Sequence, residues 1–280
     1  MIIDAHQHFW HYDPVRHGWI TDSMAILRRD FLPPDLEPEL VQNGVDACVL
    51  VQAEQSERET EFLLQLADRS EKIAGVVGWI DLASPNIAEK LKQYAQFTKL
   101  RGFRHIVQDE PDDRFLLREE VVRGIQALNH FGHTYDILIY PKQLPAALEL
   151  VSRLPGHKFV IDHLAKPLIR ENILEPWASQ MRAIAKYPNV YCKVSGLVTE
   201  ANWTGWTEQD FRPYLDVVRE AFGAKRLMFG SEWPVCLLAS SYSRVKKLVE
   251  GYSRNFSSEE CEQIFGGTAT HFYGLENGPR

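Results

Sequence analysis

The hydrophobic pattern of the chain alternates between short apolar runs and longer segments of helical periodicity. Eight apolar runs of strand length recur, each bounded by polar or turn-forming residues. They span Ile2–His8, Ala47–Ala53, Ile73–Asp81, Leu100–Gln108, Tyr135–Tyr140, Lys158–His163, Val190–Leu197 and Arg226–Glu232. We therefore predict eight strands.

Amphipathic segments fill the gaps between these predicted strands. In Glu57–Arg69, apolar residues at spacings of three and four form one stripe: Phe62, Leu63, Leu66 and Ala67. Ser84 and Pro85 predict the start of the next helix, because serine is a favoured cap and proline suits the first helical position. Further helices are predicted over Arg118–Phe131, Leu144–Leu154, Glu175–Tyr187, Thr207–Phe222 and Tyr242–Tyr252.

The alternation of strands and helices predicts the fold. Such strands pair in parallel, and right-handed crossovers between eight of them close the sheet into a barrel. An open doubly wound sheet usually carries a glycine-rich turn after its first strand, whereas this chain has the run His6–Trp10 there. No linker or low-complexity stretch divides the 280 residues. We predict an α/β protein with a single-domain (β/α)8 TIM barrel over residues 1–280.

Composition and charge narrow the expected binding partners and the expected cellular compartment. With 45% hydrophobic and 25% charged residues the chain is an ordinary globular protein. Its net charge of −7 and its lack of a basic stripe argue against nucleic acid and anionic membranes as partners. The four cysteines are scattered, which indicates reduced thiols and not a disulfide framework. Because the first residues lack an export signal and no run of ~18 apolar residues occurs, we expect a cytoplasmic protein.

A pair of histidines closes the first predicted strand. His6 and His8 are separated by one residue, and side chains alternate between the two faces of a strand. The two imidazoles are therefore expected to lie side by side. Such a pair can hold one divalent cation or polarise one carbonyl group. The alternative is that both are ordinary polar residues at the end of a strand.

Other polar residues follow the same barrel end. In a (β/α)8 barrel the reactive site lies at the carboxyl ends of the strands. The polar residues predicted there are His6, His8, Gln52, Glu54, Arg104, His105, Tyr140, Asp162, His163, Lys166, Lys193, Ser195 and Glu232. This convergence of histidines, carboxylates and cations predicts a site at the barrel mouth.

Several of these residues lie in segments that resemble one family. The segments are the pair His6-x-His8 and the runs Gly102–Pro111 (GFRHIVQDEP), Ile161–Pro167 (IDHLAKP) and Met228–Pro234 (MFGSEWP). Together they resemble the amidohydrolase superfamily, and most closely its sugar-lactonase branch. The resemblance extends in order over nearly the whole chain.

The resemblance implies hydrolysis of a small-molecule lactone at the barrel mouth. Matching positions make Glu232 the general base that takes a proton from water, with His163 as its catalytic partner. His6, His8 and His163 would orient and polarise the ester carbonyl, directly or through a metal, and so stabilise the charge that builds on its oxygen. The resemblance leaves open which lactone is opened and whether the protein forms an oligomer.

The same residues are the candidate ligands of a metal ion. A catalytic zinc usually has three protein ligands and a water. His6, His8, His163 and Glu232 could supply the ligands of one divalent ion, with zinc as the expected metal. A binuclear centre is not expected, because the lysine that bridges two metals on strand four of binuclear relatives is missing here. One lactonase of the branch works without metal, so one ion or none both stay open.

Glu232 is a departure from the pattern of the branch. The eighth strand there usually reads Gly-Ser-Asp-Trp-Pro, whereas this chain has glutamate in the aspartate position. A displacement near 1 Å can lower a rate on the order of a hundredfold, although the two carboxyl groups have similar reference acidities. A shifted substrate, a repositioned water or metal, and an altered enzyme are the three explanations left open.

Five further residues are candidates for substrate binding. The planar donor fork of Arg104 suits a clamp on substrate oxygens, although a salt bridge in the barrel wall is an alternative. Arg104 and His105 are neighbours that face opposite ways, so only one of them can face the site. Lys166 follows the sixth strand, and Trp10 and Trp233 flank catalytic candidates, where aromatic rings commonly pack against sugars.

Two other functions compete with lactone hydrolysis. A decarboxylase of the same superfamily would share the barrel and the histidine pair but cleave a carbon–carbon bond. A binding protein on a catalytically impaired barrel is the second alternative, with Glu232 as the sign of impairment. The HIVQDEP run favours the lactonase, and the presence of three site histidines argues against an impaired barrel.

Overall fold

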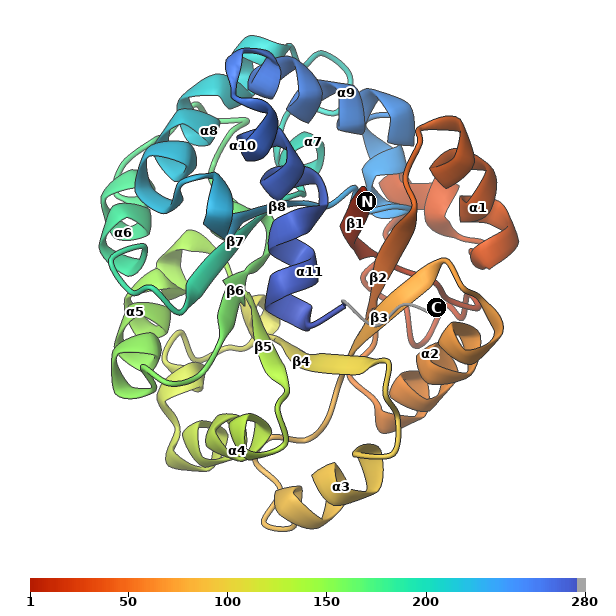
Figure 1. Ribbon diagram of the computed structural model, residues 1–280, viewed down its shortest axis with the longest axis vertical. Helices are drawn as coiled ribbons and strands as arrows, with labels where there is room; N and C mark the ends of the chain where they lie inside the picture. Colours follow the sequence, from red (N-terminus) through yellow and green to blue (C-terminus); the bar gives the residue numbers. More distant parts are fainter. Residues whose placement is uncertain (276–280) are drawn as a thin grey trace.

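A computed structural model describes residues 1–275 and confirms the (β/α)8 barrel (Figure 1). Eight parallel strands form one sheet in chain order. The strands are β1 (Ile3–Gln7), β2 (Ala47–Val51), β3 (Ile73–Gly78), β4 (Leu100–Ile106), β5 (Thr134–Leu138), β6 (Phe159–Ile161), β7 (Val190–Val194) and β8 (Leu227–Phe229). The helices are α1 (Pro33–Gln42), α2 (Glu57–Arg69), α3 (Ile87–Tyr94), α4 (Glu119–His130), α5 (Leu144–Arg153), α6 (Trp177–Ile184), α7 (Leu197–Glu200), α8 (Glu208–Phe222), α9 (Tyr242–Tyr252), α10 (Ser258–Glu262) and α11 (Thr268–Tyr273).

Some predicted boundaries are confirmed and others are wrong. Helices α2 and α9 have the predicted ends. Helix α3 begins later than Ser84 and Pro85 suggest, because the Ser84 hydroxyl accepts a hydrogen bond from Asn86 in a preceding turn and Ile87 is the first helical residue. All eight strands end one to three residues earlier than predicted, and after β6 and β8 the chain enters residues with positive φ, at His163 and Glu232. Helices α1, α7, α10 and α11 were not predicted.

A cluster of apolar side chains fills part of the barrel interior. Ile3 and Ala5 of β1 pack there with Val49 and Val51 of β2 and with Phe272 of α11. Figure 1 shows α11 lying across the ring of strands. This helix covers the barrel end opposite the mouth, because the turn before it lies against the first residues of the chain.

Backbone hydrogen bonds join β1 to the segment after β8. The Glu232 amide donates to the His6 carbonyl at 2.8 Å, and the His8 amide donates to the Trp233 carbonyl at 2.7 Å. Gly230 permits this close approach, since a Cβ there would lie 2.6 Å from the Cβ of His6. The join between the first and last strands therefore places Glu232 next to the histidine pair.

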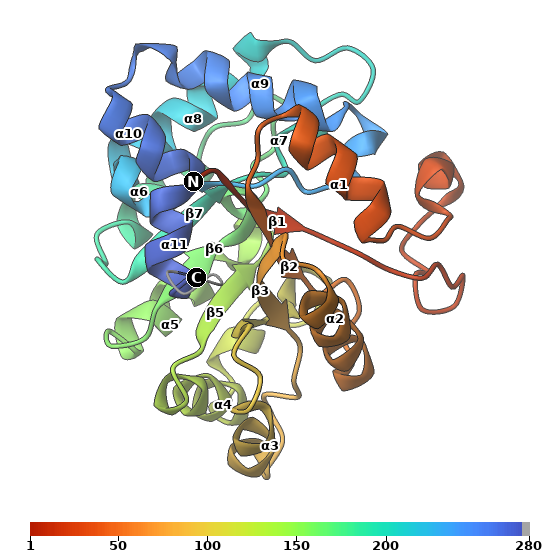
Figure 2. The same cartoon turned by 45° about the vertical axis from the view of Figure 1, so that its right-hand side comes forward.

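The loop between β1 and α1 extends beyond the barrel, as Figure 2 shows on its right-hand side. Reciprocal backbone bonds between Trp10 and Phe31, at 2.9 and 3.0 Å, close the base of this loop. The loop brings Trp19 and Met24 to the barrel mouth, where both line the cavity described below.

Other features of the described chain agree with the sequence. All four cysteines are free thiols, and three of them are buried. Within residues 1–275, no helix is both long and apolar enough to cross a membrane.

Gly124 provides a test of how α4 packs. Alanine inside a helix is normally more favourable than glycine by about 0.5–1 kcal/mol, but a Cβ on Gly124 would overlap the carbonyl oxygen of Leu82. We expect Gly124→Ala to lower the free energy of unfolding by about 1–3 kcal/mol, measured by chemical denaturation. Gly156→Ala is the control, because a Cβ there meets no atom within 4 Å. A stabilised Gly124→Ala variant would contradict this packing.

Candidate active site

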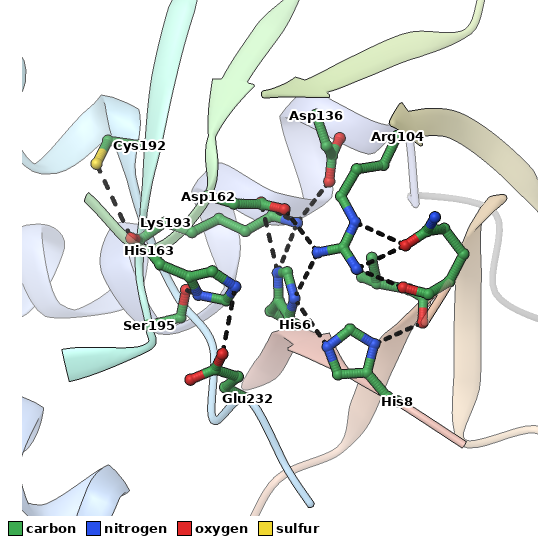
Figure 3. A network of polar contacts seen from close by, with 12 residues as sticks. His6, His8, Arg104, Asp136, Asp162, His163, Cys192, Lys193, Ser195 and Glu232 are labelled. Carbon is green, nitrogen blue, oxygen red and sulfur yellow. Dashed lines mark hydrogen bonds and ion pairs between the residues drawn. The ribbon is translucent and has the colours of Figure 1, made fainter. Parts of the chain in front are cut away.

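The histidine pair lies at the barrel mouth as the alternation of strand side chains predicts (Figure 3). The Nε2 atoms of His6 and His8 are 3.2 Å apart, and both residues are buried. The pairing register of β1 and β2 shifts between Asp4 and Gln7. This shift allows Ala5 and His6, although consecutive, both to face the interior.

A network of buried charges surrounds His6 (Figure 3). The Lys193 ammonium lies 2.6 Å from Asp136, 3.0 Å from Asp162 and 3.1 Å from Nδ1 of His6. The Arg104 guanidinium lies 3.0 Å from the other oxygen of Asp162 and 3.2 Å from Nε2 of His6. Two cations therefore offset two carboxylates in a region from which water is excluded, as buried charges require.

Arg104 has its hydrogen bonds directed into the barrel wall. Its Nε and one terminal nitrogen donate to the Gln52 side chain at 3.0 and 2.7 Å, and that terminal nitrogen also donates to the Gln52 carbonyl. The other terminal nitrogen contacts Asp162 and His6. Arg104 borders the cavity, but these contacts favour a positioning role over a clamp on substrate.

Glu232 and His163 face one another at the other side of the mouth. Nε2 of His163 lies 3.5 Å from Oε1 of Glu232, and its Nδ1 lies 2.8 Å from the Ser195 hydroxyl. The Thr199 hydroxyl donates to Oε2 of Glu232 at 3.0 Å. Burial raises the pKa of Glu232 to about 7, against the opposing effect of the Lys166 ammonium. A carboxyl group with this pKa suits proton transfer near neutral pH.

Unusual backbone conformations direct these two side chains. His163 to Lys166 are four consecutive residues with positive φ, and Glu232 has φ 58°. Residues other than glycine pay about 1–3 kcal/mol each for such conformations, which cluster at functional sites. Gly196 allows the His163 ring to pack closely, because a Cβ there would lie 2.7 Å from it.

Burial favours the neutral form of the site histidines. Burial lowers the pKa of His6, His8 and His163 well below the usual range. Nδ1 of His8 donates to the Val51 carbonyl at 2.8 Å, so neutral His8 has its free electron pair on Nε2. For Asp162, burial alone would raise the pKa, but Lys193 and other neighbours hold it well below its usual range.

This set of donors fits a divalent ion. Nitrogen atoms bound to one tetrahedral zinc at 2.0–2.1 Å are about 3.3 Å apart, close to the 3.2 Å between His6 and His8. Within residues 1–275, the compact cluster of donors within 4.8 Å of one another is His6, Asp162 and His163. Asp162 was not among the predicted ligands, and its oxygens already pair with Lys193 and Arg104. Of the other predicted ligands, His8 adjoins His6 and Glu232 adjoins His163.

A cavity of about 370 Å³ opens above these residues. Lys166 lines it and pairs with Glu200 at 3.5 Å. Trp10 also lines the cavity, with its indole nitrogen donating to the Arg29 carbonyl at 3.0 Å. Trp233 does not line it, because its ring is buried against Phe9 and Phe31.

His105 lies outside the cavity. Its Nε2 is 2.7 Å from Glu110, its Nδ1 accepts from the Trp79 indole at 3.2 Å, and its ring stacks on Phe115. The structure therefore brings Arg104, and not its neighbour, to the site. His105 instead holds the turn that follows β4.

Sequence reasoning gave no role to several residues of the site. Asp136 is the single charge within the apolar run of β5, a signal that could have marked it as buried and paired. Tyr273 of α11 donates to Asp136 at 2.7 Å, and Thr199 of α7 contacts Glu232. Both come from helices that the hydrophobic pattern did not predict, so no signal pointed to them.

The fold is a (β/α)8 barrel with a cluster of buried polar side chains at the carboxyl ends of its strands, the end at which barrel enzymes carry their active sites. The chain belongs to the amidohydrolase family, whose model matches residues 3–275. It is 43% identical over 284 residues to L-fucono-1,5-lactonase of Burkholderia multivorans, covering 98% of this chain and 96% of that protein. It is 37% identical to L-fucono-1,5-lactonase of Burkholderia ambifaria, with the same coverage.

A solved structure with bound zinc shares the fold. The crystal structure of an amidohydrolase from Burkholderia multivorans with bound zinc superposes with a TM-score of 0.96 and 42% identity. The match covers 98% of this chain and 99% of that chain. The barrel and its connections are therefore shared almost completely between the two proteins.

We expect purified protein to carry about one divalent ion per chain, because neutral, buried imidazoles favour metal binding. Elemental analysis should show loss of this ion in His163→Asn, and chelation should lower the midpoint of thermal unfolding of the wild type. His130→Asn is the control, since His130 is exposed on α4. Equal metal content in all three proteins would contradict the assignment of the ligands.

Proposed function

We propose that this protein hydrolyses a sugar-derived lactone to the corresponding aldonic acid. The observation that carries the proposal is the Glu232 carboxylate, buried at the mouth of the cavity and facing His163 at 3.5 Å. The similarity to two L-fucono-1,5-lactonases supports lactone hydrolysis over a decarboxylase or a binding protein. Six-carbon aldono-1,5-lactones are the first substrates to test.

Glu232 is the general base of the proposed reaction. It takes a proton from water as the water oxygen attacks the lactone carbonyl, which gives a tetrahedral intermediate with a negative oxygen. When the intermediate collapses, the bond to the ring oxygen breaks and protonated Glu232 returns the proton to that oxygen. The product is the open-chain hydroxy acid, and the carboxylate is regenerated.

The site histidines and their neighbours are placed to activate the lactone carbonyl. His6 and His8 are held by Lys193, Arg104 and the Val51 carbonyl, so that their positions are set before substrate binds. His6, His8, His163 and Glu232 would hold the divalent ion. When bound, such an ion polarises the carbonyl and lowers the pKa of water.

Thr199 provides a reason for glutamate at position 232. Its hydroxyl donates to Oε2 of Glu232, which leaves Oε1 on the side of His163. Aspartate is one methylene shorter and could not keep both contacts from the same backbone position. We propose that this chain uses the additional length to place the basic oxygen.

We expect the wild type to acidify a weakly buffered solution of at least one member of a panel of six-carbon aldonolactones. Glu232→Gln should lower the rate by a factor on the order of 10²–10⁴, because the amide cannot accept the proton. Glu89→Gln, on the exposed face of α3, should keep the wild-type rate. Proton release no faster than the spontaneous reaction over the whole panel would refute the proposal.

A second variant tests the length of the base. We expect Glu232→Asp to lower kcat/KM by a factor of about ten to a hundred, since the carboxylate moves by about one bond length. The measurement is steady-state kinetics on the best lactone of the panel. An unchanged rate would mean that local rearrangement absorbs the methylene and that Thr199 has no part in placing the base.

A further inference from the structure

One ion pair has both of its side chains in the wall of the cavity. Lys166 follows β6 and Glu200 ends α7, and both residues line the cavity. Their side chains are 14% and 22% exposed, whereas those of Asp162 and Lys193 have no exposed surface. Lys166 and Glu200 are therefore charged groups that a molecule bound in the cavity can contact directly.

The contacts of this ion pair leave hydrogen-bonding capacity for a ligand. The Lys166 ammonium lies 3.5 Å from Oε1 of Glu200 and 5.5 Å from the centre of the Tyr140 ring. A direct hydrogen bond between opposite charges is about 2.7–2.9 Å long, so the contact with Glu200 is an ion pair without a short hydrogen bond. An ammonium group carries several N–H donors, and a carboxylate carries several lone pairs. Both groups can therefore bind a partner in the cavity.

The backbone places the pair beside the reactive groups. Lys166 is the last of the four residues with positive φ that begin at His163, and its amide donates to the His163 carbonyl at 2.7 Å. Glu200 follows Thr199, whose hydroxyl donates to Glu232. Burial raises the pKa of Glu232, and the two charges act on this pKa in opposite directions, Lys166 lowering it and Glu200 raising it. A lactone held with its carbonyl at Glu232 would therefore present its ring to the pair.

We propose that Lys166 and Glu200 bind hydroxyl groups on adjacent carbons of the lactone ring, with Lys166 donating to one oxygen and Glu200 accepting from the other. A hydroxyl group both donates and accepts, so two adjacent hydroxyls complement a donor and an acceptor that lie 3.5 Å apart. The proposal rests on the proposed function and adds that the substrate is a polyhydroxylated lactone. A site built to hydrogen-bond a hydroxyl discriminates strongly against analogues that lack it.

The test compares the preferred aldono-1,5-lactone with analogues that each lack one ring hydroxyl. For the wild type, the absence of either recognised hydroxyl should lower kcat/KM by about ten- to a hundredfold, because a hydrogen bond to a charged group is lost. In Lys166→Met one of these two penalties should disappear. In Glu200→Met the penalty for the adjacent hydroxyl should disappear. Methionine fills the space of either side chain but offers no N–H donor and only a weak acceptor.

The ratio of kcat/KM between the parent lactone and each analogue separates recognition from other roles of the pair. Both substitutions change the charge near Glu232, but that change acts on every lactone and cancels in the ratio. Loss of a purely structural ion pair would also leave the ratio unchanged. Lys225→Met and Glu259→Met are the matched controls, because these residues form an exposed ion pair outside the cavity. Both controls should keep the wild-type ratios.

Three results would overturn the inference while the proposed function stands. The first is a wild type that opens every analogue as fast as the parent lactone. The second is a set of penalties that persists unchanged in Lys166→Met and Glu200→Met. The third is that the two substitutions remove penalties at hydroxyls on carbons that are not adjacent. If the wild type opens no lactone at all, the proposed function fails and the inference falls with it.

Discussion

The pairing of buried charges inside the barrel is the constraint on which the site depends. Removing an ion from water costs several kcal/mol unless an opposite charge and hydrogen bonds replace the solvent. Lys193 and Arg104 therefore lie against Asp136 and Asp162, and these four side chains come from β4, β5, β7 and the turn after β6. Their pairing aligns four consecutive segments of the barrel. It also holds His6, which contacts both cations, and so sets the position of the histidine pair.

Besides the buried charges, two local features of the backbone position the site residues. A backbone bond from the Glu232 amide to the His6 carbonyl joins the segment after β8 to β1, so the proposed base lies next to the histidine pair. The positive φ values at His163 and Glu232 then turn both side chains toward one another. These conformations are unfavourable on their own, and surrounding packing such as that of Gly196 maintains them. The cavity accordingly has a rigid floor, which is what a reaction dependent on position requires.

The candidate site could be predicted from the sequence only in part. Strand periodicity and the rule that barrel sites lie at the carboxyl ends were enough to bring together His6, His8, His163 and Glu232. The same reasoning left Arg104 between two roles, because a sequence does not show which acceptors surround a guanidinium. The structure supplies Gln52 and Asp162 as those acceptors. It also separates His105 from the cavity, since adjacent strand residues face opposite ways.

The sequence by itself determined the eight strands, most of the helices that cover them and the polar residues at the barrel mouth. These features follow from local periodicity, which each segment carries in its own residues. Only the tertiary structure decided that Asp136 and Tyr273 support the site, that Thr199 holds Glu232, and that Lys166 pairs with Glu200 in the cavity wall. Each of these depends on atoms far apart in the chain. Their meeting is set by barrel closure and by the need to pair buried charge, which no local pattern records.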